Sequence, residues 1–162
     1  MKFVHNSLSL HKPTSLILNS MDRPNVFIAA IPIGPGNIKT RHELNAVIPE
    51  NCSDVTEIRK IMIFIDSRLA VCEVVDQLES KLKPNLRKGE VVMDYSTILS
   101  EHRREITMEN FKTSSNTRVL VCTEVAGMGV DVDDIEVVIQ WTIPSHLNLS
   151  GFIQRAGRCA RN

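Results

Sequence analysis

Short apolar runs alternate along this chain with longer stretches that are polar or amphipathic. The runs cover residues 26–31, 61–65, 91–93, 119–122 and 135–141. Most are continuous rather than alternating in polarity, which is typical of strands covered on both faces. The pattern therefore predicts a buried strand at each run.

Helical spacing appears between the second and third runs. Apolar residues recur there on one face of a helix, at Val71, Val74, Val75, Leu78 and Leu82. Either Asp66 or Ser67 is expected to cap this helix. Two more helices are predicted over residues 100–111 and 145–156, the last with an apolar face formed by Leu149, Phe152, Ile153 and Ala156.

Alternation of covered strands with helices predicts an α/β fold, in which a mostly parallel sheet carries helices on both faces. Ligands of such sheets bind beyond the carboxyl ends of the strands. Polar clusters follow three of the predicted strands, namely Asp66-Ser67-Arg68, Ser96-Thr97 and Thr123-Glu124. We expect them to lie along one edge of the sheet.

The domain boundaries follow from punctuation by proline and glycine. Residues 1–24 are expected to form an irregular lead-in or interlobe linker, and residues 25–162 a single domain. The least regular part, residues 32–57, is predicted to be a loop or insertion with a short helix over 42–47.

Charge and cysteine content exclude several classes of protein. Lysine plus arginine and aspartate plus glutamate number 19 each, which argues against a polybasic protein that binds phosphate by bulk attraction. The four cysteines form no C-x-x-C pair, and neither they nor the five histidines have metal-ligand spacing. We expect a reducing compartment, no metal site and no membrane span.

One segment resembles a phosphate-binding loop but lacks a glycine that such a loop requires. Residues 34–40 read Gly-Pro-Gly-Asn-Ile-Lys-Thr, but a phosphate-binding loop needs glycine directly before the lysine. Ile38 takes that place, so this segment is interpreted as a surface loop.

The last fifth of the chain has a distinct charge pattern. No carboxylate occurs over residues 142–162, and Arg158 and Arg161 follow directly after Gly157, which is expected to end a helix. Two guanidiniums at such a turn suit a phosphate-bearing ligand, because their planar forks bind phosphate oxygens bidentately. Taken alone, they are equally consistent with ion pairs to the acidic stretch over residues 131–136.

A second motif precedes that acidic stretch. The predicted strand over 119–122 leads into Thr123 and then into a Gly-x-Gly loop, Gly127-Met128-Gly129, followed by Asp131. Thr123 is placed to bond a phosphate, and Asp131 to accept a hydrogen bond from a ribose hydroxyl.

Together these motifs resemble the second RecA-like lobe of superfamily-two helicases, the helicase C-terminal domain. The resemblance is best over residues 60–162: residues 63–68 resemble motif IV, 123–131 motif V, and 154–161 the motif VI pattern Q-x-x-G-R-x-x-R. Residues 22–26, Asp-Arg-Pro-Asn-Val, resemble the entry into this lobe in RecQ-like DNA helicases. The Gly-Met-Gly loop also favours that group, especially its divergent fungal forms.

The resemblance implies a nucleotide-facing set of residues. Arg158 and Arg161 match the arginine fingers that reach the γ-phosphate of ATP, and Gln154 matches a residue that couples nucleotide to the interlobe cleft. Gly129 and Asp131 match the nucleotide-facing end of motif V. ATP with Mg²⁺ would then be bound mainly by a first lobe that this chain lacks.

A nucleic-acid-facing set is also implied. Thr123 matches the threonine that contacts the backbone of the single strand, and Ser67 and Arg68 match motif IV positions near that strand. Ser96 and Thr97 are weaker candidates for the same role. The implied partners are single-stranded or duplex DNA and a first RecA-like lobe.

The implied function is that of the C-terminal motor lobe of an ATP-dependent 3′-to-5′ DNA helicase, an enzyme with a nuclear location, or otherwise a cytoplasmic one. The sequence has no Walker A lysine and no DEAH-type magnesium box, so we expect a lobe fragment or truncated product that hydrolyses no ATP unaided. Two alternatives stay open: an inactive module that binds nucleic acid or a partner, and a lobe of an RNA helicase.

Overall fold

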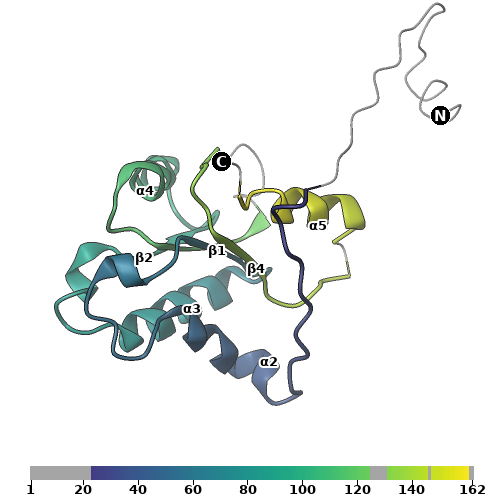
Figure 1. The fold of residues 1–162 in the computed structure, drawn as a ribbon, viewed down its shortest axis with the longest axis horizontal. Coiled ribbons are helices and arrows are strands. Elements are labelled where there is room, and N and C mark those ends of the chain that lie inside the picture. The colour runs from purple at the N-terminus through teal and green to yellow at the C-terminus, as the bar shows by residue number, and fades with distance from the viewer. Residues whose placement is uncertain (1–22, 125–130, 146, 161–162) are drawn as a thin grey trace, which may run out of the picture.

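The computed structural model describes residues 23–124, 131–145 and 147–160, and these form a parallel sheet with helices packed against it (Figure 1). The strands are β1 (Ile61–Phe64), β2 (Val92–Tyr95), β3 (Val119–Cys122) and β4 (Val137–Gln140). Their order across the sheet is β2-β3-β1-β4, and every pairing is parallel. The α/β fold expected from the alternating pattern is confirmed.

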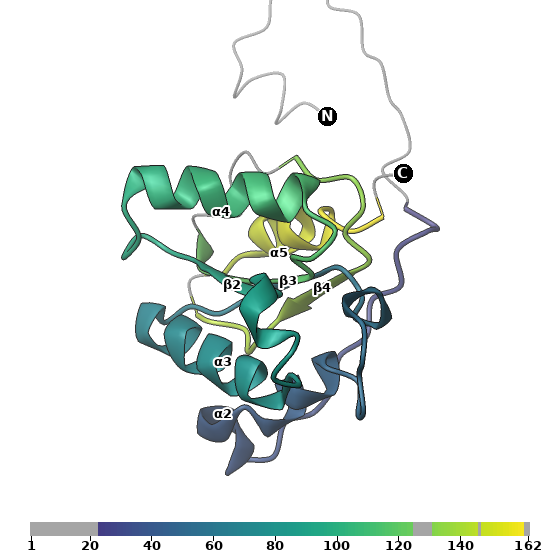
Figure 2. The same ribbon diagram turned by 90° about the vertical axis from the view of Figure 1, so that its left-hand side faces the viewer.

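Helix α3 (Arg68–Lys81) covers one face of the sheet, together with the 3₁₀ helix η1 (His42–Val47). Ile61 and Ile63 of β1 point toward this face and belong to the same buried cluster as Val71, Val74 and Leu78 of α3. Figure 2 shows α3 and the short helix α2 (Asn37–Thr40) on this side. The predicted helical stripe is therefore the inner face of α3.

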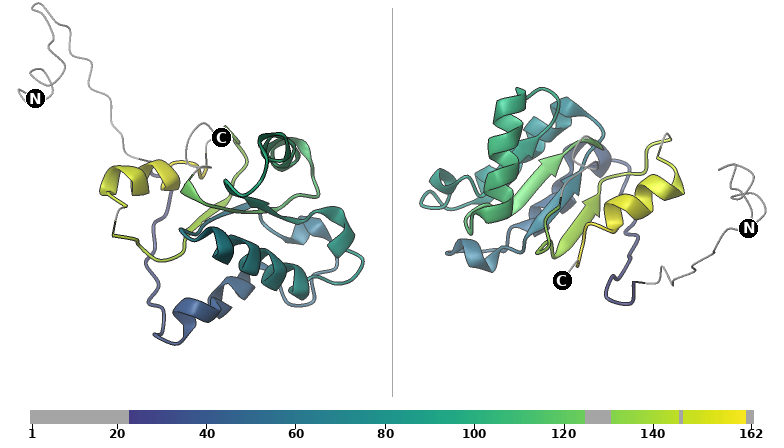
Figure 3. Two further views of the ribbon diagram at one scale, coloured as in Figure 1. Left: turned by 180° about the vertical axis from the view of Figure 1, so that it is seen from behind. Right: turned by 90° about the horizontal axis from the view of Figure 1, so that it is seen from above.

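Helices α4 (Glu101–Thr113) and α5 (Leu149–Ala156) lie on the opposite side of the sheet (Figures 2 and 3). Met62 and Phe64, which alternate with Ile61 and Ile63 along β1, pack there with Phe111 of α4. The expectation of helices on both faces is thus confirmed, and the alternation along β1 divides the core into two clusters.

Side-chain caps define where the three longer helices begin. Ser67 accepts a hydrogen bond from the amide of Ala70, Ser100 caps α4 in the same way, and the Asn148 side chain caps α5. Of the two caps proposed for the first helix, Ser67 is the one used. Helix α5 begins at Leu149, four residues after the predicted start. No helix among the described residues is long and apolar enough to cross a membrane.

The first apolar run is not a strand, so the expectation for residues 26–31 was wrong. Phe27, Ile28 and Ile31 are 92%, 61% and 78% exposed. The run passes α5 on its way to α2 (Figure 1), and the side chains just before it bond the tail of the chain rather than β4. The run therefore does not form a strand of the sheet.

The segment over 32–57 folds into short helical turns. The helix predicted over 42–47 is present as η1. The next turn, η2 (Val55–Glu57), begins with a capping box: the side chain of Asp54 accepts a hydrogen bond from the backbone of Glu57, and the side chain of Glu57 accepts one from the backbone of Asp54. A further 3₁₀ turn, η3 (Arg87–Gly89), precedes β2. Residues 1–22, most of the predicted lead-in, lie outside the described residues.

Candidate nucleotide and nucleic-acid interface

The polar residues that follow β1, β2 and β3 meet at the carboxyl edge of the sheet. Because β3 lies between β2 and β1, the loops after β1 and β2 flank the end of β3. Arg68 spans that end: its Nη1 donates to Thr97 Oγ1 at 3.4 Å. The amide of Thr123, the first residue after β3, donates to the carbonyl of Tyr95 at 3.2 Å. The three loops predicted to share this edge are thus joined directly.

The candidates for nucleic-acid contact differ in how much surface they present. Ser67, Arg68 and Thr97 are exposed, whereas Thr123 is 8% exposed. Ser96 is fully buried, and its Oγ accepts from the amide of Ile98 within the turn. A phosphate contact through Ser67, Arg68 or Thr97 needs no rearrangement; one through Ser96 requires the turn to open. These five roles stay predictions.

A buried arginine of α5 links the same edge to the neighbouring elements. Arg155 is 3% exposed, and its Nη1 donates to Gln140 Oε1 at the end of β4 and lies 3.6 Å from Asp66 Oδ1 after β1. Its Nη2 lies 3.8 Å from Glu124 Oε1 after β3, and its guanidinium carbon stands 5.1 Å from the centre of the Phe64 ring. One side chain thus touches the ends of three strands.

The buried side chain of α5 is Arg155 and not a member of its predicted apolar face. On that face, Leu149 and Ile153 are 73% and 51% exposed, whereas Phe152 and Ala156 are half-buried. The sheet end that α5 covers carries the amide of Gln140 and the carboxylate of Asp66, so a cation rather than an apolar side chain is required there. Sequence reasoning missed Arg155. The available signal was Asp66, which directly follows the run over 61–65, and Gln140, a polar residue within the run over 135–141.

Gly157 ends α5, as predicted, and the chain turns into the tail that carries the two candidate arginine fingers. A Cβ at Gly157 would lie 3.1 Å from the carbonyl oxygen of Ile153, which is a tight contact. Arg158 is 7% exposed, whereas Gln154 is exposed. Arg161 and Gly129 lie outside the described residues, and Asp131, which is described, is exposed.

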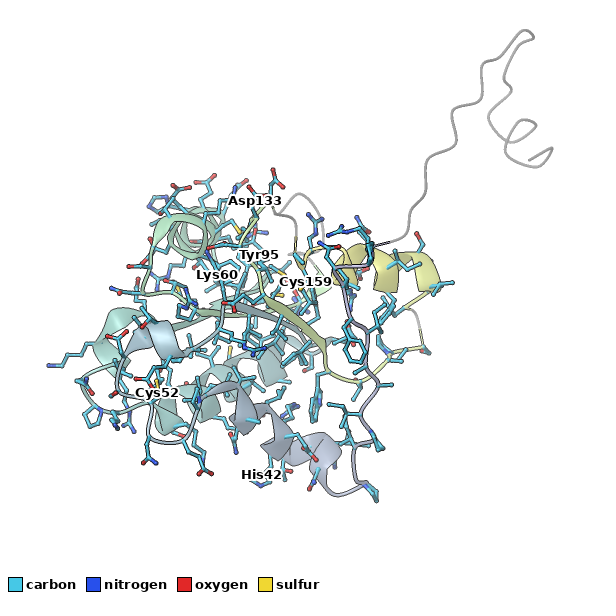
Figure 4. All side chains as sticks on the ribbon, in the orientation of Figure 1. His42, Cys52, Lys60, Tyr95, Asp133 and Cys159 are labelled. Atoms are coloured by element: carbon cyan, nitrogen blue, oxygen red, sulfur yellow. The ribbon has the colours of Figure 1, made fainter. Side chains whose placement is uncertain are left out.

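The tail is bonded at both sides. Ala160 donates its amide to the carbonyl of Ile135 at 3.0 Å, and Cys159 Sγ donates to the carbonyl of Glu136 at 2.9 Å. From the opposite direction, Arg23 Nη2 donates to the carbonyls of Cys159 and Ala160, at 3.1 and 2.7 Å. Figure 4 labels Cys159. Burial raises the pKa of its thiol, and the Arg23 guanidinium partly offsets that rise.

The acidic stretch before β4 has cationic partners outside the tail. Lys60 Nζ lies 2.8 Å from Asp134 Oδ1 and 5.0 Å from the centre of the Phe111 ring, and Arg118 Nη2 lies 3.4 Å from Glu136 Oε1. Two of the carboxylates offered as alternative partners of Arg158 and Arg161 are therefore engaged by other basic residues.

The donor groups of this edge suit phosphate better than a metal ion. Arg68 presents an exposed guanidinium at this edge, whereas Arg155 is buried there against Gln140. No group of three histidine, cysteine or acidic residues among the described residues is placed to hold a metal. A nucleotide phosphate fits this chemistry, whereas any Mg²⁺ that accompanies it would need ligands from another protein segment.

The family described as "Helicase conserved C-terminal domain" matches residues 42–162 of this chain. The chain belongs to that family. The match covers both the resemblance to motifs IV, V and VI and the short turns before β1, so the family assignment rests on most of the folded domain.

Curated relatives of this helicase C-terminal domain are RNA helicases by name. The chain is 32% identical over 102 residues to the pre-mRNA-processing ATP-dependent RNA helicase Prp5 of Mycosarcoma maydis, covering 63% of this chain and 8% of that protein. It is 30% identical over 108 residues to the ATP-dependent RNA helicase Fal1 of Schizosaccharomyces pombe, covering 67% and 25%. The chain thus spans a quarter or less of these relatives.

Solved structures with the same fold include DEAD-box proteins. The C-terminal domain of the DEAD-box protein Dbp5 superposes with a TM-score of 0.58 at 19% identity, covering 78% of this chain and 64% of that one. Domain 2 of the DEAD-box helicase Mss116p, bound to an RNA duplex, gives 0.57 at 21% identity, covering 78% and 45%. At these identities the likeness concerns the fold.

These comparisons change the finer part of the resemblance. They support a superfamily-two helicase C-terminal lobe, as expected, but the relatives named above are RNA helicases and not RecQ-like DNA helicases. DNA as the substrate, the RecQ-like group and an isomerase activity therefore lack support. The RNA helicase lobe, given above as an alternative, agrees better.

Proposed function

We propose that this helicase C-terminal lobe works as the second motor lobe of an ATP-dependent RNA helicase. The observation that carries the proposal is the joining of the motif IV, V and VI segments at one edge of the sheet. There, Arg155 of α5 touches residues that follow β1 and β3, and Arg68 bridges to the loop after β2. In such a lobe, the helix that faces the nucleotide contacts the loops that bind the nucleic acid. Binding of one ligand can therefore affect binding of the other.

We assign the binding of RNA and the binding of ATP to two different groups of residues. Ser67, Arg68 and Thr97, which are exposed, would bind the phosphates of single-stranded RNA. Arg158 and Arg161 would supply positive charge to the γ-phosphate of ATP held by a first lobe, and Gln154 and Asp131 would belong to the same nucleotide-facing group. When ATP and Mg²⁺ are bound, they supply the phosphoryl chemistry, and the residues of this chain orient and stabilise charge.

The direct test requires two lobes. We would join this chain to the first RecA-like lobe of a DEAD-box relative and measure ATP hydrolysis with and without single-stranded RNA. The Arg158→Gln variant should lower kcat about 10³-fold or more, because arginine fingers contribute that much to phosphoryl transfer. Binding of RNA should be nearly unchanged, since Arg158 lies on the nucleotide side. Arg103→Gln, at an exposed α4 residue whose ion pair with Glu90 is 3.6 Å long, serves as the control.

The substrate is decided by a second measurement. Affinity and ATPase stimulation should be compared for single-stranded RNA and DNA of the same sequence at one stated salt concentration. Stronger stimulation by DNA would return the assignment to a DNA helicase. A two-lobe protein with normal turnover in the Arg158→Gln form would refute the finger role. We expect the chain by itself to hydrolyse no ATP, and a nuclear location also stays a prediction.

A further inference from the structure

Two side chains at the amino-terminal end of the described chain hold the turn between the candidate arginine fingers. Arg23 Nη2 donates to the carbonyl oxygens of Cys159 and Ala160, and Asn25 Nδ2 donates to the carbonyl oxygen of Ala160 at 2.8 Å. Arg23 and the tail are more than 130 positions apart in the sequence. We call the side chains of Arg23 and Asn25, with the carbonyls they bind, the tail clasp.

The two donors of the tail clasp also fix one another. Arg23 Nε donates to Asn25 Oδ1 at 3.3 Å, which leaves the amide nitrogen of Asn25 directed at Ala160. Only one orientation of the Asn25 amide satisfies both bonds, because its oxygen accepts from the guanidinium while its nitrogen donates. The clasp is therefore a specific arrangement of donors and not a general attraction of a cation to a chain end.

The turn that the clasp holds needs external support. Ala160 has a φ of 51°, the left-handed region that residues with a Cβ rarely adopt. Both polar backbone groups of Ala160 are bonded, the amide to Ile135 and the carbonyl to Arg23 and Asn25. Its carbonyl carbon is joined to the nitrogen of Arg161, and Arg158 lies two residues before it. The backbone between the two arginines is thus held from both sides.

We propose that Arg23 and Asn25 are positioning residues, which hold the turn after α5 and so fix the backbone next to Arg158. The inference deepens the proposed motor function and rests on it for its consequence in catalysis. Arg23 and Asn25 reach the tail through the backbone carbonyls of Cys159 and Ala160. Misplacement of a catalytic group by about 1 Å costs as much as 10² in rate, so loosening this turn is expected to lower turnover.

The first test uses the 162-residue chain alone and does not depend on catalysis. Arg158 is 7% exposed, so phenylglyoxal should modify it slowly in the native chain, as judged by mass spectrometry of its peptide. Arg23→Gln and Asn25→Asp should each speed this modification about fivefold, the effect expected when one or two hydrogen bonds that keep the turn closed are lost. Arg155, which is 3% exposed and bonded to Gln140, is the internal reference.

Matched control variants come from the same part of the chain. Arg41→Gln removes an arginine whose Nη1 bonds Lys39 and Glu73, and Asn37→Asp alters an amide that bonds Glu43. In the described part of the chain, these bonds do not involve the tail. Both should leave the modification rate of Arg158 unchanged. If the clasp variants also leave it unchanged, the turn is held by other contacts and the proposal is wrong.

The second test uses the two-lobe protein described above. Arg23→Gln and Asn25→Asp should lower kcat about 10- to 100-fold while the KM for ATP and the affinity for RNA stay within about twofold. Arg23→Lys should restore part of kcat, because an ammonium can bond one carbonyl but lacks the planar fork. Equal losses in Arg23→Lys and Arg23→Gln, or a rise in KM with normal kcat, would overturn the positioning role.

The two tests separate the two proposals. If the unaltered two-lobe protein hydrolyses no ATP, the motor function fails, and the modification rates of Arg158 alone decide whether the clasp holds the turn. If turnover is normal in the unaltered protein and also in both clasp variants, the clasp has no role in positioning and only the motor function survives.

Discussion

Arg155 is the residue on which the arrangement of the carboxyl edge depends most. A guanidinium that is 3% exposed has lost nearly all of its water, and it regains contacts from Gln140, from Asp66 and from the face of the Phe64 ring. Removing one partner of a buried charged set leaves the other polar groups without compensation. The side chain therefore stabilises the fold at the same place where it joins the loops.

We expect Arg155→Ala to lower the free energy of unfolding by about 3 kcal/mol, because the amide of Gln140 and the carboxylate of Asp66 lose a cation that is 3% exposed. Arg155→Lys should recover part of that loss by keeping the charge without the second donor. Urea denaturation followed by circular dichroism measures both.

The matched control for Arg155→Ala is Arg103→Ala on α4. The side chain of Arg103 is 50% exposed and its ion pair with Glu90 is 3.6 Å long. Exposed pairs of this kind contribute less than about 1 kcal/mol. Similar losses of stability in the two alanine variants would mean that Arg155 is not an organising contact of this edge.

At the scale of whole elements, the sequence was most informative where burial and local chemistry agree. Continuous apolar runs identified β1 and β3, whose residues are all buried. Helical spacing identified α3, and Ser67, one of the two caps offered, precedes it. Residues 26–31 were misassigned because an apolar run reports the tendency to be buried and not the presence of a free strand edge to join. The buried position of α5 was not predicted, because an arginine and not an apolar side chain occupies it.

Only part of the candidate site was predictable from the sequence, namely the part that follows from the order of the strands. Polar residues after parallel strands must share an edge, so the proximity of Arg68 and Thr97 follows from strand order. The contacts of Arg155 and the tail clasp depend on side chains from segments far apart in sequence, and no local pattern encodes them.

Ser67 combines two roles that a pair of substitutions can separate. Its hydroxyl caps α3, and it is also a predicted contact of a nucleic-acid strand. Ser67→Ala should lower the free energy of unfolding by about 1 kcal/mol through loss of the cap. Ser67→Asp should keep the stability, since aspartate is an equally good cap that also favours the helix dipole, but it should weaken RNA binding by repelling phosphate.

Thermal denaturation of the chain and RNA binding by fluorescence anisotropy measure the two effects of Ser67 independently. Ser100→Asp on α4 shows how an added carboxylate at another N-cap affects each of them. If Ser67→Asp binds RNA as well as the unaltered chain does, Ser67 does not face the nucleic acid and only its role as a cap survives.

The two hydrophobic clusters of the described residues share the strands of one sheet. The strands contribute to both clusters, since Ile61 and Ile63 pack under α3 while Met62 and Phe64 pack under α4. When these strands unfold, both clusters lose the strand residues that they pack against. We therefore expect the two clusters to be lost together, as is usual for a domain of this size.

The native cysteines provide probes of both faces without any substitution. Cys52 belongs to the cluster under α3 and Cys122 to the cluster under α4, with exposures of 4% and 0%, whereas Cys72 on α3 is exposed (Figure 4 labels Cys52). Burial raises the pKa of the thiols of Cys52 and Cys122, so at neutral pH each is less ionised than an ordinary thiol and reacts still more slowly in the folded chain.

Brief alkylation across a urea series, read by mass spectrometry, should show Cys72 labelled at every concentration and Cys52 and Cys122 becoming labelled at one shared midpoint. The shared midpoint is expected because unfolding either cluster removes the common strands from the other. Repeating the series at higher pH should move the shared midpoint to lower urea concentration, because the two buried thiols have raised pKa values in the fold and ionise more readily when unfolded. Midpoints for Cys52 and Cys122 separated by more than about 0.5 M urea, which for a slope of about 2 kcal/mol per M corresponds to about 1 kcal/mol, would mean that the two faces of the sheet open independently.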